Sequence, residues 1–384
     1  MTEPEVEVSV VMPCLNEEQT VGECVRKAQK ALLDLGVTGE VIVADNGSTD
    51  RSVEIAESLG ARVVHQPEPG YGNAYLAGLA AARGRYIVMG DSDNTYDFAE
   101  LPRFVELLRQ GRHDLVIGSR LRGTVKAGAM PFLHRYVGTP VLTALLNLFV
   151  GVQISDTQSG MRGLTREAYR RLRLKTSGME FASEMIVRAA RERLRIAEIP
   201  ITYYPRQGES KLRTFRDGWR HLRFLLLHSP TYLFLVPGAT LLAMGLGLMA
   251  LLSAGRVYFT GTFSLDIHAM IVGSLAAILG FQVISLGLYA KAYAGHAGLE
   301  EDDRVTRALT RSFTLEQGLA VGGAAILLGL GLLGFVVYQW VSHGFILEGN
   351  LQLRPALWGL TLTVLGVQTV FASFFLGVLG IRHR

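Results

Sequence analysis

The chain is poor in cysteine and has only a small excess of positive charge. Two cysteines, Cys14 and Cys24, occur in 384 residues, and the formal net charge at pH 7 is +4. Neither cysteine stands at metal-ligand spacing from a histidine, and both lie in the part of the chain that we expect to face the cytoplasm. We therefore expect two small buried side chains, with no zinc site and no disulfide. The basic residues form no groove interleaved with aromatic side chains, which argues against a nucleic-acid partner.

Several common sequence signals are also missing. The first seven residues are acidic and lead into no basic segment followed by an apolar stretch, so we expect no signal peptide. No G-x-G-x-x-G opens the first predicted helix, and no G-x-x-x-x-G-K-[ST] occurs. These absences disfavour a dinucleotide site and a P-loop.

Long apolar runs dominate the last third of the chain, at residues 231–253, 267–290, 318–340 and 355–381. None of them contains Asp, Glu, Lys or Arg, and each can cross a hydrocarbon core of ~30 Å at 1.5 Å per residue. A helical bundle buried in a soluble protein is the alternative, but helices apolar on all sides rarely form such cores at this length. We therefore predict a transmembrane domain of four spans over residues 231–384.

The connecting segments predict the orientation of these spans. The segment after the second span and the C-terminal tail are basic, whereas the other two connections have one arginine each. By the positive-inside rule, the first half of the chain should face the cytoplasm at the plasma (inner) membrane. The basic residues concerned are Lys291, Arg304, Arg307, Arg311, Arg382 and Arg384, against Arg256 and Arg354.

Residues 211–230 join the two halves with a pattern of two helical stripes. One stripe is apolar and the other is basic, which is typical of a helix lying in the membrane interface. We expect this helix to hold the first half of the chain near anionic head groups. The apolar stripe is Leu212, Phe215, Trp219 and Leu222, and the basic stripe is Arg213, Arg216, Arg220 and Arg223.

Strands alternate with helices in the first half of the chain, residues 1–210. Predicted strands cover residues 6–12, 40–44, 62–65, 86–89 and 114–118. The first helix should begin at Asn16, with Gln19 completing a capping box, and later helices should end at Gly60 or cover residues 70–83 and 101–110. Alternation of this kind predicts an α/β domain with a mostly parallel sheet covered on both faces.

Polar side chains follow the predicted strands at the edge where parallel α/β sheets bind ligands. They are Asn16 and Glu17, Asp45 and Asn46, Asp91 to Asp93, and Ser119 and Arg120. The carboxylate pair of Asp91 and Asp93 suits a hard divalent cation held against a diphosphate. Their convergence at one edge is stronger evidence than any one motif.

The strings MPCLNEE (12–18), ADNGSTD (44–50) and DSD (91–93) resemble family 2 glycosyltransferases with a GT-A type nucleotide-diphospho-sugar domain. The strings GSR (118–120), DTQSGMR (156–162) and GESK (208–211) resemble the polyprenyl-phosphate branch, which includes dolichyl-phosphate-mannose and undecaprenyl-phosphate-sugar synthases. The resemblance covers roughly residues 6–225. The chain departs from it at Asn46, where the family often has Asp, and at Tyr71, where some relatives have Lys.

The resemblance implies roles for individual residues. Asp91 and Asp93 would hold Mg²⁺ or Mn²⁺, and Asp156 and Gln158 would act with them as catalytic residues on the acceptor side. The nucleoside would be cradled by Pro13, Leu15, Glu17, Asp45 and Asn46. An acceptor phosphate would meet Arg120 and Arg135, with Arg122 as a weaker candidate. A loop with Arg206, Ser210 and Lys211 would close over the diphosphate.

The function implied is an inverting, metal-dependent glycosyltransferase that moves a hexose from a UDP- or GDP-sugar to a polyprenyl phosphate. A lipid phosphate is already anionic at pH 7, so it needs cationic positioning more than a strong base, and whether Asp156 acts as a base stays open. One alternative is a processive polysaccharide synthase, although its Q-x-x-R-W motif is missing. A non-catalytic membrane scaffold and a transporter are further alternatives, and a homo-oligomer is compatible with the sequence.

Overall fold

The computed structural model describes residues 6–208, 214–227, 229–258, 264–296, 314–345 and 352–380. The chain divides into two compact units, Met1–Leu225 and Leu226–Arg384. The boundary lies inside the predicted juxtamembrane helix, so most of that helix belongs to the first unit.

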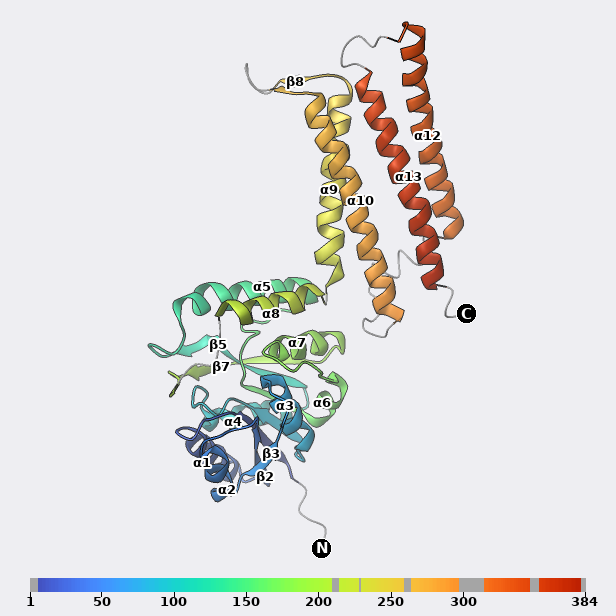
Figure 1. Ribbon diagram of the computed structural model, residues 1–384. Helices are drawn as coiled ribbons and strands as arrows, with labels where there is room; N and C mark the ends of the chain where they lie inside the picture. The colour runs from blue at the N-terminus through green and yellow to red at the C-terminus, as the bar shows by residue number, and fades with distance from the viewer. Residues whose placement is uncertain are drawn as a thin grey trace. The chain divides into compact units, whose positions relative to one another are not determined.

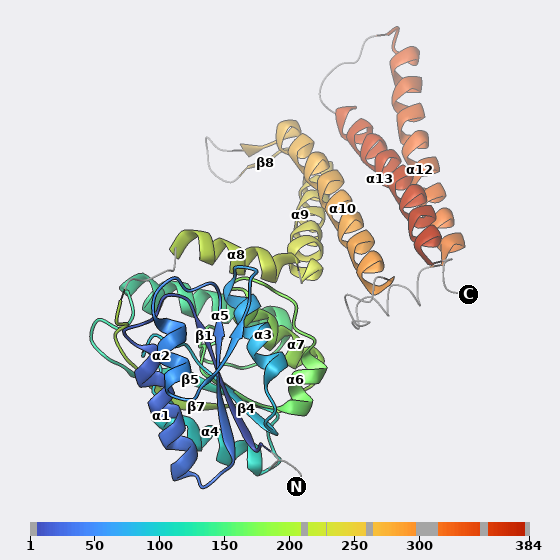
Figure 2. The same cartoon turned by 60° about the horizontal axis from the view of Figure 1, so that its bottom comes forward.

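The first unit is built on a seven-stranded sheet with the order β3-β2-β1-β4-β6-β5-β7. Only β6 runs against its neighbours β4 and β5, which confirms a mostly parallel sheet. Figure 2 shows this sheet inside the first unit, surrounded by its helices. The strands are β1 (Val8–Cys14), β2 (Gly39–Asp45), β3 (Arg62–His65), β4 (Tyr86–Met89), β5 (Leu115–Val125), β6 (Arg162–Thr165) and β7 (Ile196–Tyr203). Five of them are the strands predicted from the sequence, although β5 extends seven residues past the predicted end at 118.

Helices cover both faces of this sheet. One apolar core lies under α1 (Val21–Asp34), α2 (Ser52–Ser58) and α4 (Leu101–Arg109). The other lies under α3 (Tyr71–Ala81), α5 (Thr139–Val150), α6 (Arg166–Leu172) and α7 (Phe181–Arg191). Cys14 and Cys24 are buried, as predicted.

The predicted start of the first helix at Asn16 is wrong. The helix α1 begins at Val21, and Asn16 lies before it with a φ of 51°. Its side-chain Oδ1 accepts a hydrogen bond of 2.8 Å from the amide of Thr49. Asn16 therefore fastens the loop after β1 to the loop after β2, a contact between distant segments that a local capping pattern does not reveal.

The juxtamembrane helix α8 (Thr214–Leu227) has a third face besides the two predicted stripes. His221, Phe224 and Leu225 are buried, and the last two belong to the same apolar core as α7. Trp219, on the predicted apolar stripe, is 58 % exposed. The helix thus packs on the first unit by residues that belong to neither stripe and leaves Trp219 on its outer side.

The second unit contains four helices that are long and apolar enough to cross a membrane. These candidate spans are Thr231–Ser253, Ile267–Tyr293, Leu315–Ser342 and Leu353–Leu379, close to the four predicted runs. The first comprises η3 (Thr231–Leu235) and α9 (Val236–Ser253), and the others are α10 (Ile267–His296), α12 (Leu315–Ser342) and α13 (Leu353–Gly380) (Figure 1). A short ribbon of β8 (Val257–Tyr258) and β9 (Ser264–Leu265) joins α9 to α10.

Glycines spaced seven residues apart bring the spans together as two antiparallel pairs. A Cβ on Gly245 would lie 2.4 Å from the backbone of Ala277, and one on Gly280 would lie 2.4 Å from that of Leu242. The pair α12 and α13 repeats this arrangement with Gly322, Gly329, Gly359 and Gly366. Other glycines of the spans take no part in these contacts, because a Cβ added to Gly247, Gly331 or Gly334 would meet no described atom within 4 Å.

Candidate active site

The loops after β1 and β4 are fastened together at the carboxyl edge of the sheet. Ser92 lies between the two predicted metal ligands, and its hydroxyl donates a 2.6 Å hydrogen bond to the carbonyl of Pro13. Leu15, two residues after Pro13 in the chain, is 37 % exposed. The parallel pairing of β1 with β4 places both loops at one edge, so Pro13 and the Asp91–Asp93 segment come together as the sequence predicts.

Asp91 is held by two tyrosines from α3. The hydroxyls of Tyr71 and Tyr75 both donate to Oδ1 of Asp91, at 2.8 and 3.1 Å. Burial, together with the charge of Asp93, raises the pKa of Asp91 to about 6. Tyr71 is the residue that stands where some relatives have lysine, so this chain places a hydrogen-bond donor next to the carboxylate instead of a cation.

Asp93 and Glu17 both form ion pairs with the guanidinium of Arg206. Arg206, just after β7, approaches Oδ2 of Asp93 with Nη1 at 2.9 Å and contacts Glu17 through Nη2. The other carboxylate oxygen of Asp93 accepts from the hydroxyl of Thr95 at 2.6 Å and from its amide at 3.1 Å. Asp93 is only 6 % exposed, so Arg206 supplies a counter-charge that this nearly buried carboxylate needs.

A cavity of about 270 Å³ adjoins this bridge. It is lined by Lys27, Asn94, Tyr204, Pro205, Arg206 and Gln207. Lys27 reaches it from α1 and donates to Oδ1 of Asn94 at 2.9 Å. The space beside Asp93 thus has two cationic side chains in its wall, and both are paired with carboxylates, Lys27 with Glu23 and Arg206 with Asp93 and Glu17.

Asp45 and Asn46, after β2, shape the neighbouring loops. Asp45 accepts hydrogen bonds from the amides of Gly47 and Ser48. The side chain of Asn46 donates to the carbonyls of Gln66 and Glu68, at 3.0 and 2.8 Å. Its Oδ1 accepts from the amide of Gly70 at 2.7 Å. The Asn46 amide group is therefore engaged with the loop that leads into α3, besides the nucleoside contact that the family resemblance predicts for it.

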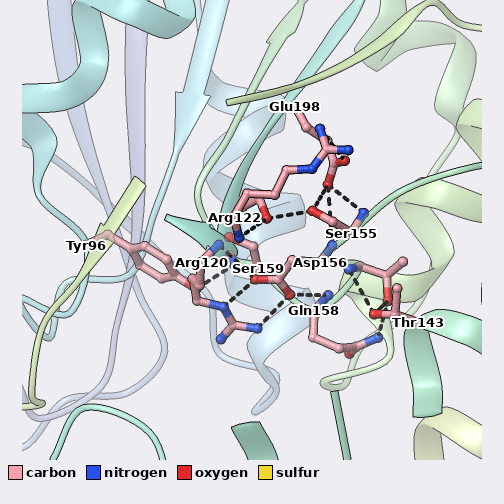
Figure 3. Close-up of polar contacts among 12 residues, drawn as sticks. Tyr96, Arg120, Arg122, Thr143, Ser155, Asp156, Gln158, Ser159 and Glu198 are labelled. Carbon is pink, nitrogen blue, oxygen red and sulfur yellow. Dashed lines mark hydrogen bonds and ion pairs between the residues drawn. The ribbon is translucent and has the colours of Figure 1, made fainter. Parts of the chain in front are cut away.

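A buried ion pair forms a second cluster. Arg120, in β5, binds both oxygens of Asp156 with Nε at 2.7 Å and Nη2 at 2.9 Å (Figure 3). The guanidinium also lies 5.1 Å from the ring centroid of Tyr203. Burial opposes the charge of Asp156, but Arg120 outweighs it and lowers the pKa of this carboxyl. A carboxylate held in this way is a weak base, so the geometry suits Asp156 to orienting Arg120 better than to accepting a proton.

Glu198 supports this pair from β7. Its Oε1 accepts from the hydroxyl and amide of Ser155 at 2.9 and 2.8 Å and from the amide of Asp156 at 3.3 Å (Figure 3). Arg122 lies 3.5 Å from the other oxygen of Glu198 and has a 60 % exposed side chain. The turn that carries Asp156 is thus anchored to the edge strand of the sheet.

Gln158 and Arg162 continue the same loop into the core. The side-chain Nε2 of Gln158 lies 3.1 Å from Oγ1 of Thr157 and 3.3 Å from Oγ of Ser183. Arg162 is fully buried and donates to the carbonyls of Ser159, Thr157 and Ala182. Three carbonyls at one guanidinium fix the loop between Asp156 and β6, so this arginine acts on the shape of the site.

The two clusters meet at Gly160. Its amide donates to the hydroxyl of Tyr96 at 2.7 Å, and a Cβ here would lie 3.1 Å from Oδ2 of Asp91. Tyr96 in turn packs against Tyr203, the ring beneath Arg120, with a centroid distance of 5.2 Å. The carboxylate cluster and the arginine–aspartate pair therefore form one continuous site.

Three other predicted residues have no described contact with this site or fall outside the described residues. Arg135 is half-buried in η2 (His134–Gly138), where its guanidinium lies 5.3 Å from the ring centroid of Tyr136. Ser210 and Lys211 fall outside the described residues. Asp97 caps the short 3₁₀ helix Phe98–Glu100 by accepting a hydrogen bond from the amide of Ala99.

Some side chains at the site carried no usable signal in the sequence. Tyr71 and Tyr75 sit on a helix with no polar face, and Glu184, an acidic residue in the first turn of α7, has the sequence pattern of a surface residue. Glu184 is instead buried and accepts from the amides of Lys175 and Thr176. The loop so held donates no side chain to the site, but Ser177 accepts from the amide of Gly72 at 2.9 Å and thereby positions the start of α3.

Asp91 and Asp93 can hold a hard divalent cation when water and substrate phosphates supply its remaining ligands. Among the described residues, no group of three or more His, Cys, Asp or Glu gathers as a metal site. Asp93 turns an oxygen toward a cation, and Asp91 keeps Oδ2 outside its two tyrosine contacts. Two carboxylate residues are enough for Mg²⁺ or Mn²⁺ when water and substrate phosphates complete the shell.

Comparison with known proteins identifies both halves of the chain. Residues 9–173 match glycosyl transferase family 2, and residues 288–380 match the glycosyltransferase family 2 C-terminal transmembrane region. The low-salt glycan biosynthesis hexosyltransferase Agl6 of Haloferax volcanii is 43 % identical over 374 residues, which span 97 % of this chain and 89 % of the relative. The dolichyl-phosphate hexose transferase of Haloferax volcanii is 36 % identical over 55 % of this chain and 89 % of its own.

Solved structures with similarity include a glucosyl-3-phosphoglycerate synthase. The enzyme from Mycobacterium tuberculosis, in complex with Mn²⁺, UDP-glucose and phosphoglyceric acid, is 27 % identical and gives a TM-score of 0.47. The match covers 58 % of this chain and 79 % of that one.

Proposed function

Because the chain belongs to glycosyltransferase family 2 and is a glycosyltransferase, we propose that it transfers a hexose from a UDP- or GDP-sugar to a polyprenyl phosphate. The product would be a lipid-linked monophosphoryl sugar with an inverted anomeric centre. The observation that carries this proposal is the single continuous site in which Asp91 and Asp93 meet the buried pair of Arg120 and Asp156. A hexosyltransferase relative over nearly the whole chain and a dolichyl-phosphate hexose transferase relative over the first half support it.

On the donor side, the loops after β1, β2 and β4 would receive the nucleotide. Pro13, Leu15, Glu17 and Asp45 line these loops, while Asn46 keeps the connection to α3 in shape. Asp93, with Asp91, would hold Mg²⁺ or Mn²⁺, which supplies charge stabilisation for the departing diphosphate. Arg206 stands at the same oxygen of Asp93 and would turn to the diphosphate as the loop that includes Ser210 and Lys211 closes.

On the acceptor side, Arg120 would present its remaining donors to the lipid phosphate. Asp156 takes Nε and Nη2 and so fixes the plane of the guanidinium. The lipid phosphate needs orientation toward the anomeric carbon, and a rigid arginine supplies it without a general base. Arg135 would assist only after moving from Tyr136, and Gln158 would orient the acceptor or the sugar hydroxyls.

The proposed setting is the cytoplasmic face of the inner membrane. Four apolar helices and the family's transmembrane region make this a membrane protein. The exposed Trp219 and the arginines of α8 support contact with the lipid interface. A homo-oligomer is compatible with this arrangement.

The decisive experiment offers purified full-length protein a panel of labelled nucleotide sugars with a polyprenyl phosphate, followed by identification of the lipid product. We expect one sugar to appear on the lipid phosphate in a chelator-sensitive reaction. Asp93→Ala should abolish transfer while the protein stays folded. Elongating polysaccharide in place of a single-sugar lipid would show the processive alternative, and absence of any transfer with every donor would favour the scaffold.

A further inference from the structure

A buried histidine of α8 is connected to the acceptor side of the site. His221 is 7 % exposed, and its Nδ1 lies 3.0 Å from Oγ of Ser183 in α7. The same Ser183 oxygen lies 3.3 Å from the side-chain Nε2 of Gln158. Ser183 is itself completely buried, so its contact with His221 is made away from water, whereas Gln158 is half-buried. Three side chains from separate segments thus form a chain that ends two residues from Asp156.

The neighbouring contacts make this chain stiff. Gln158 also lies 3.1 Å from Oγ1 of Thr157, whose hydroxyl lies 3.0 Å from that of Thr143 in α5. On α8, Phe224 and Leu225 are buried in the apolar core that includes α7. Hydrogen-bonded side chains of this kind favour one arrangement. A buried polar group that lost its partner would keep the cost of its removal from water without a hydrogen bond to offset it. The position of α8 and the orientation of Gln158 are therefore linked.

Chemistry favours a structural histidine here over an acid or base. Burial lowers the pKa of His221 to about 4, so the ring is neutral at physiological pH. A neutral imidazole offers one nitrogen as an acceptor and one as a donor. The α8 helix ends at Leu227, and the first candidate span begins at Thr231. His221 thus stands on the segment that leads directly from the site into the transmembrane part of the chain.

We propose that His221 is a positioning residue for sugar transfer: through Ser183 it orients Gln158, and it thereby makes acceptance of the lipid phosphate depend on the seating of α8. This inference rests on the proposed function for its acceptor, and on the described contacts for its mechanism. The donor side has its own connections through α3 and the loops after β1 and β4. Loss of the His221 contact should therefore affect the acceptor and spare the donor.

The test compares His221→Phe with His221→Asn in the full-length protein. Phenylalanine fills the space without a polar atom, whereas asparagine restores one close to the position of Nδ1. We expect His221→Phe to raise KM for the polyprenyl phosphate about five- to tenfold, with KM for the nucleotide sugar unchanged. His221→Asn should return the acceptor KM to within about twofold of the parent. Equal effects on donor and acceptor, or no rescue by asparagine, would overturn the proposal.

Ser183→Ala supplies a second variant, with the exposed Ser58→Ala on α2 as its control. The double variant with His221→Phe should be no worse than the more impaired single variant, because both remove the same chain. Additive losses would contradict it.

Hydrogen exchange measured by mass spectrometry gives a readout that needs no substrate. His221→Phe should accelerate exchange in the segment 155–160 and His221→Asn should not. If the parent makes no lipid-linked product, the proposed function fails, and the exchange result still decides whether His221 orders this loop. Unchanged exchange in His221→Phe would remove the link itself.

Discussion

Arg206 places Nη1 2.9 Å from Oδ2 of Asp93, the carboxylate that we expect to ligate the metal. The guanidinium also contacts Glu17, on the loop after β1. One cation of the chain thus stands where a divalent ion would compete for the same oxygen. Binding of the metal and release of Arg206 should be coupled, since two cations at one nearly buried carboxylate repel each other.

Arg206→Gln should therefore strengthen Mn²⁺ binding in the absence of nucleotide. We expect the dissociation constant to fall several-fold, by about the worth of a partly buried ion pair, and calorimetry or electron paramagnetic resonance can measure it. Arg103→Gln is the control. Arg103 lies on α4, its side chain is 47 % exposed, and it pairs with Glu100 in the short 3₁₀ helix before α4. Unchanged or weaker Mn²⁺ binding by Arg206→Gln would contradict the competition.

The pair of Arg120 and Asp156 should be far more important for stability than a similar pair at the surface. Asp156→Asn leaves a buried guanidinium without its counter-charge, which costs on the order of 3–5 kcal/mol in unfolding free energy. Arg195 and Asp114 make the same two-point contact, at 3.0 and 2.7 Å, with a 56 % exposed arginine side chain. Asp114→Asn should cost about 1 kcal/mol or less. Thermal unfolding in detergent compares the two, and similar shifts would contradict the difference in burial.

The carboxylate of Glu184 should make stability depend on pH. Burial opposes its charge, but hydrogen bonds from the amides of Lys175 and Thr176 outweigh burial and lower the pKa of Glu184. A depressed pKa means that the stabilisation is complete above the ordinary pKa of glutamate and is lost as the pH falls from there through the folded-state pKa.

Glu184→Gln should accordingly lower the unfolding midpoint at pH 7 and lose this difference from the parent as the solution is acidified. Midpoints recorded from pH 7 downward test this, with the exposed Glu57→Gln on α2 as control. A gap between parent and Glu184→Gln that stays constant with pH would show that lost packing, and not charge, causes the effect.

Two glycines of α12 should respond differently to the same substitution. A Cβ at Gly329 would lie 2.4 Å from Oγ1 of Thr363 and 2.7 Å from the carbonyl of Gly359, whereas one at Gly331 meets no described atom within 4 Å. Gly329→Leu should separate α12 from α13 and lower the unfolding midpoint in detergent, because small residues permit this approach. Gly331→Leu should be tolerated. Equal destabilisation by both would indicate that the Gly331 face also packs against a partner.

Much of the fold could be predicted because its signals are local. Short runs rich in β-branched residues placed β3 and β4 at their observed limits, and the absence of charge marked all four spans. No strand or helix is predicted from the sequence between residue 119 and the juxtamembrane helix. The antiparallel β6 lies there, within a short segment, Arg162–Thr165, that carries no clear alternation. Its place between β4 and β5 depends on pairing with distant strands.

The amino-acid sequence by itself determined the α/β domain, the four apolar spans and the set of polar residues at the ends of the strands, because each follows from patterns within a few neighbouring residues. Only the tertiary structure decided what those residues contact. It paired Arg120 with Asp156, and it directed the side chain of Asn46 toward the loop that leads into α3. It also joined His221 to Gln158 through Ser183. These partners are far apart in the chain, and whether they meet depends on burial and on the register of packed elements, which local patterns do not encode.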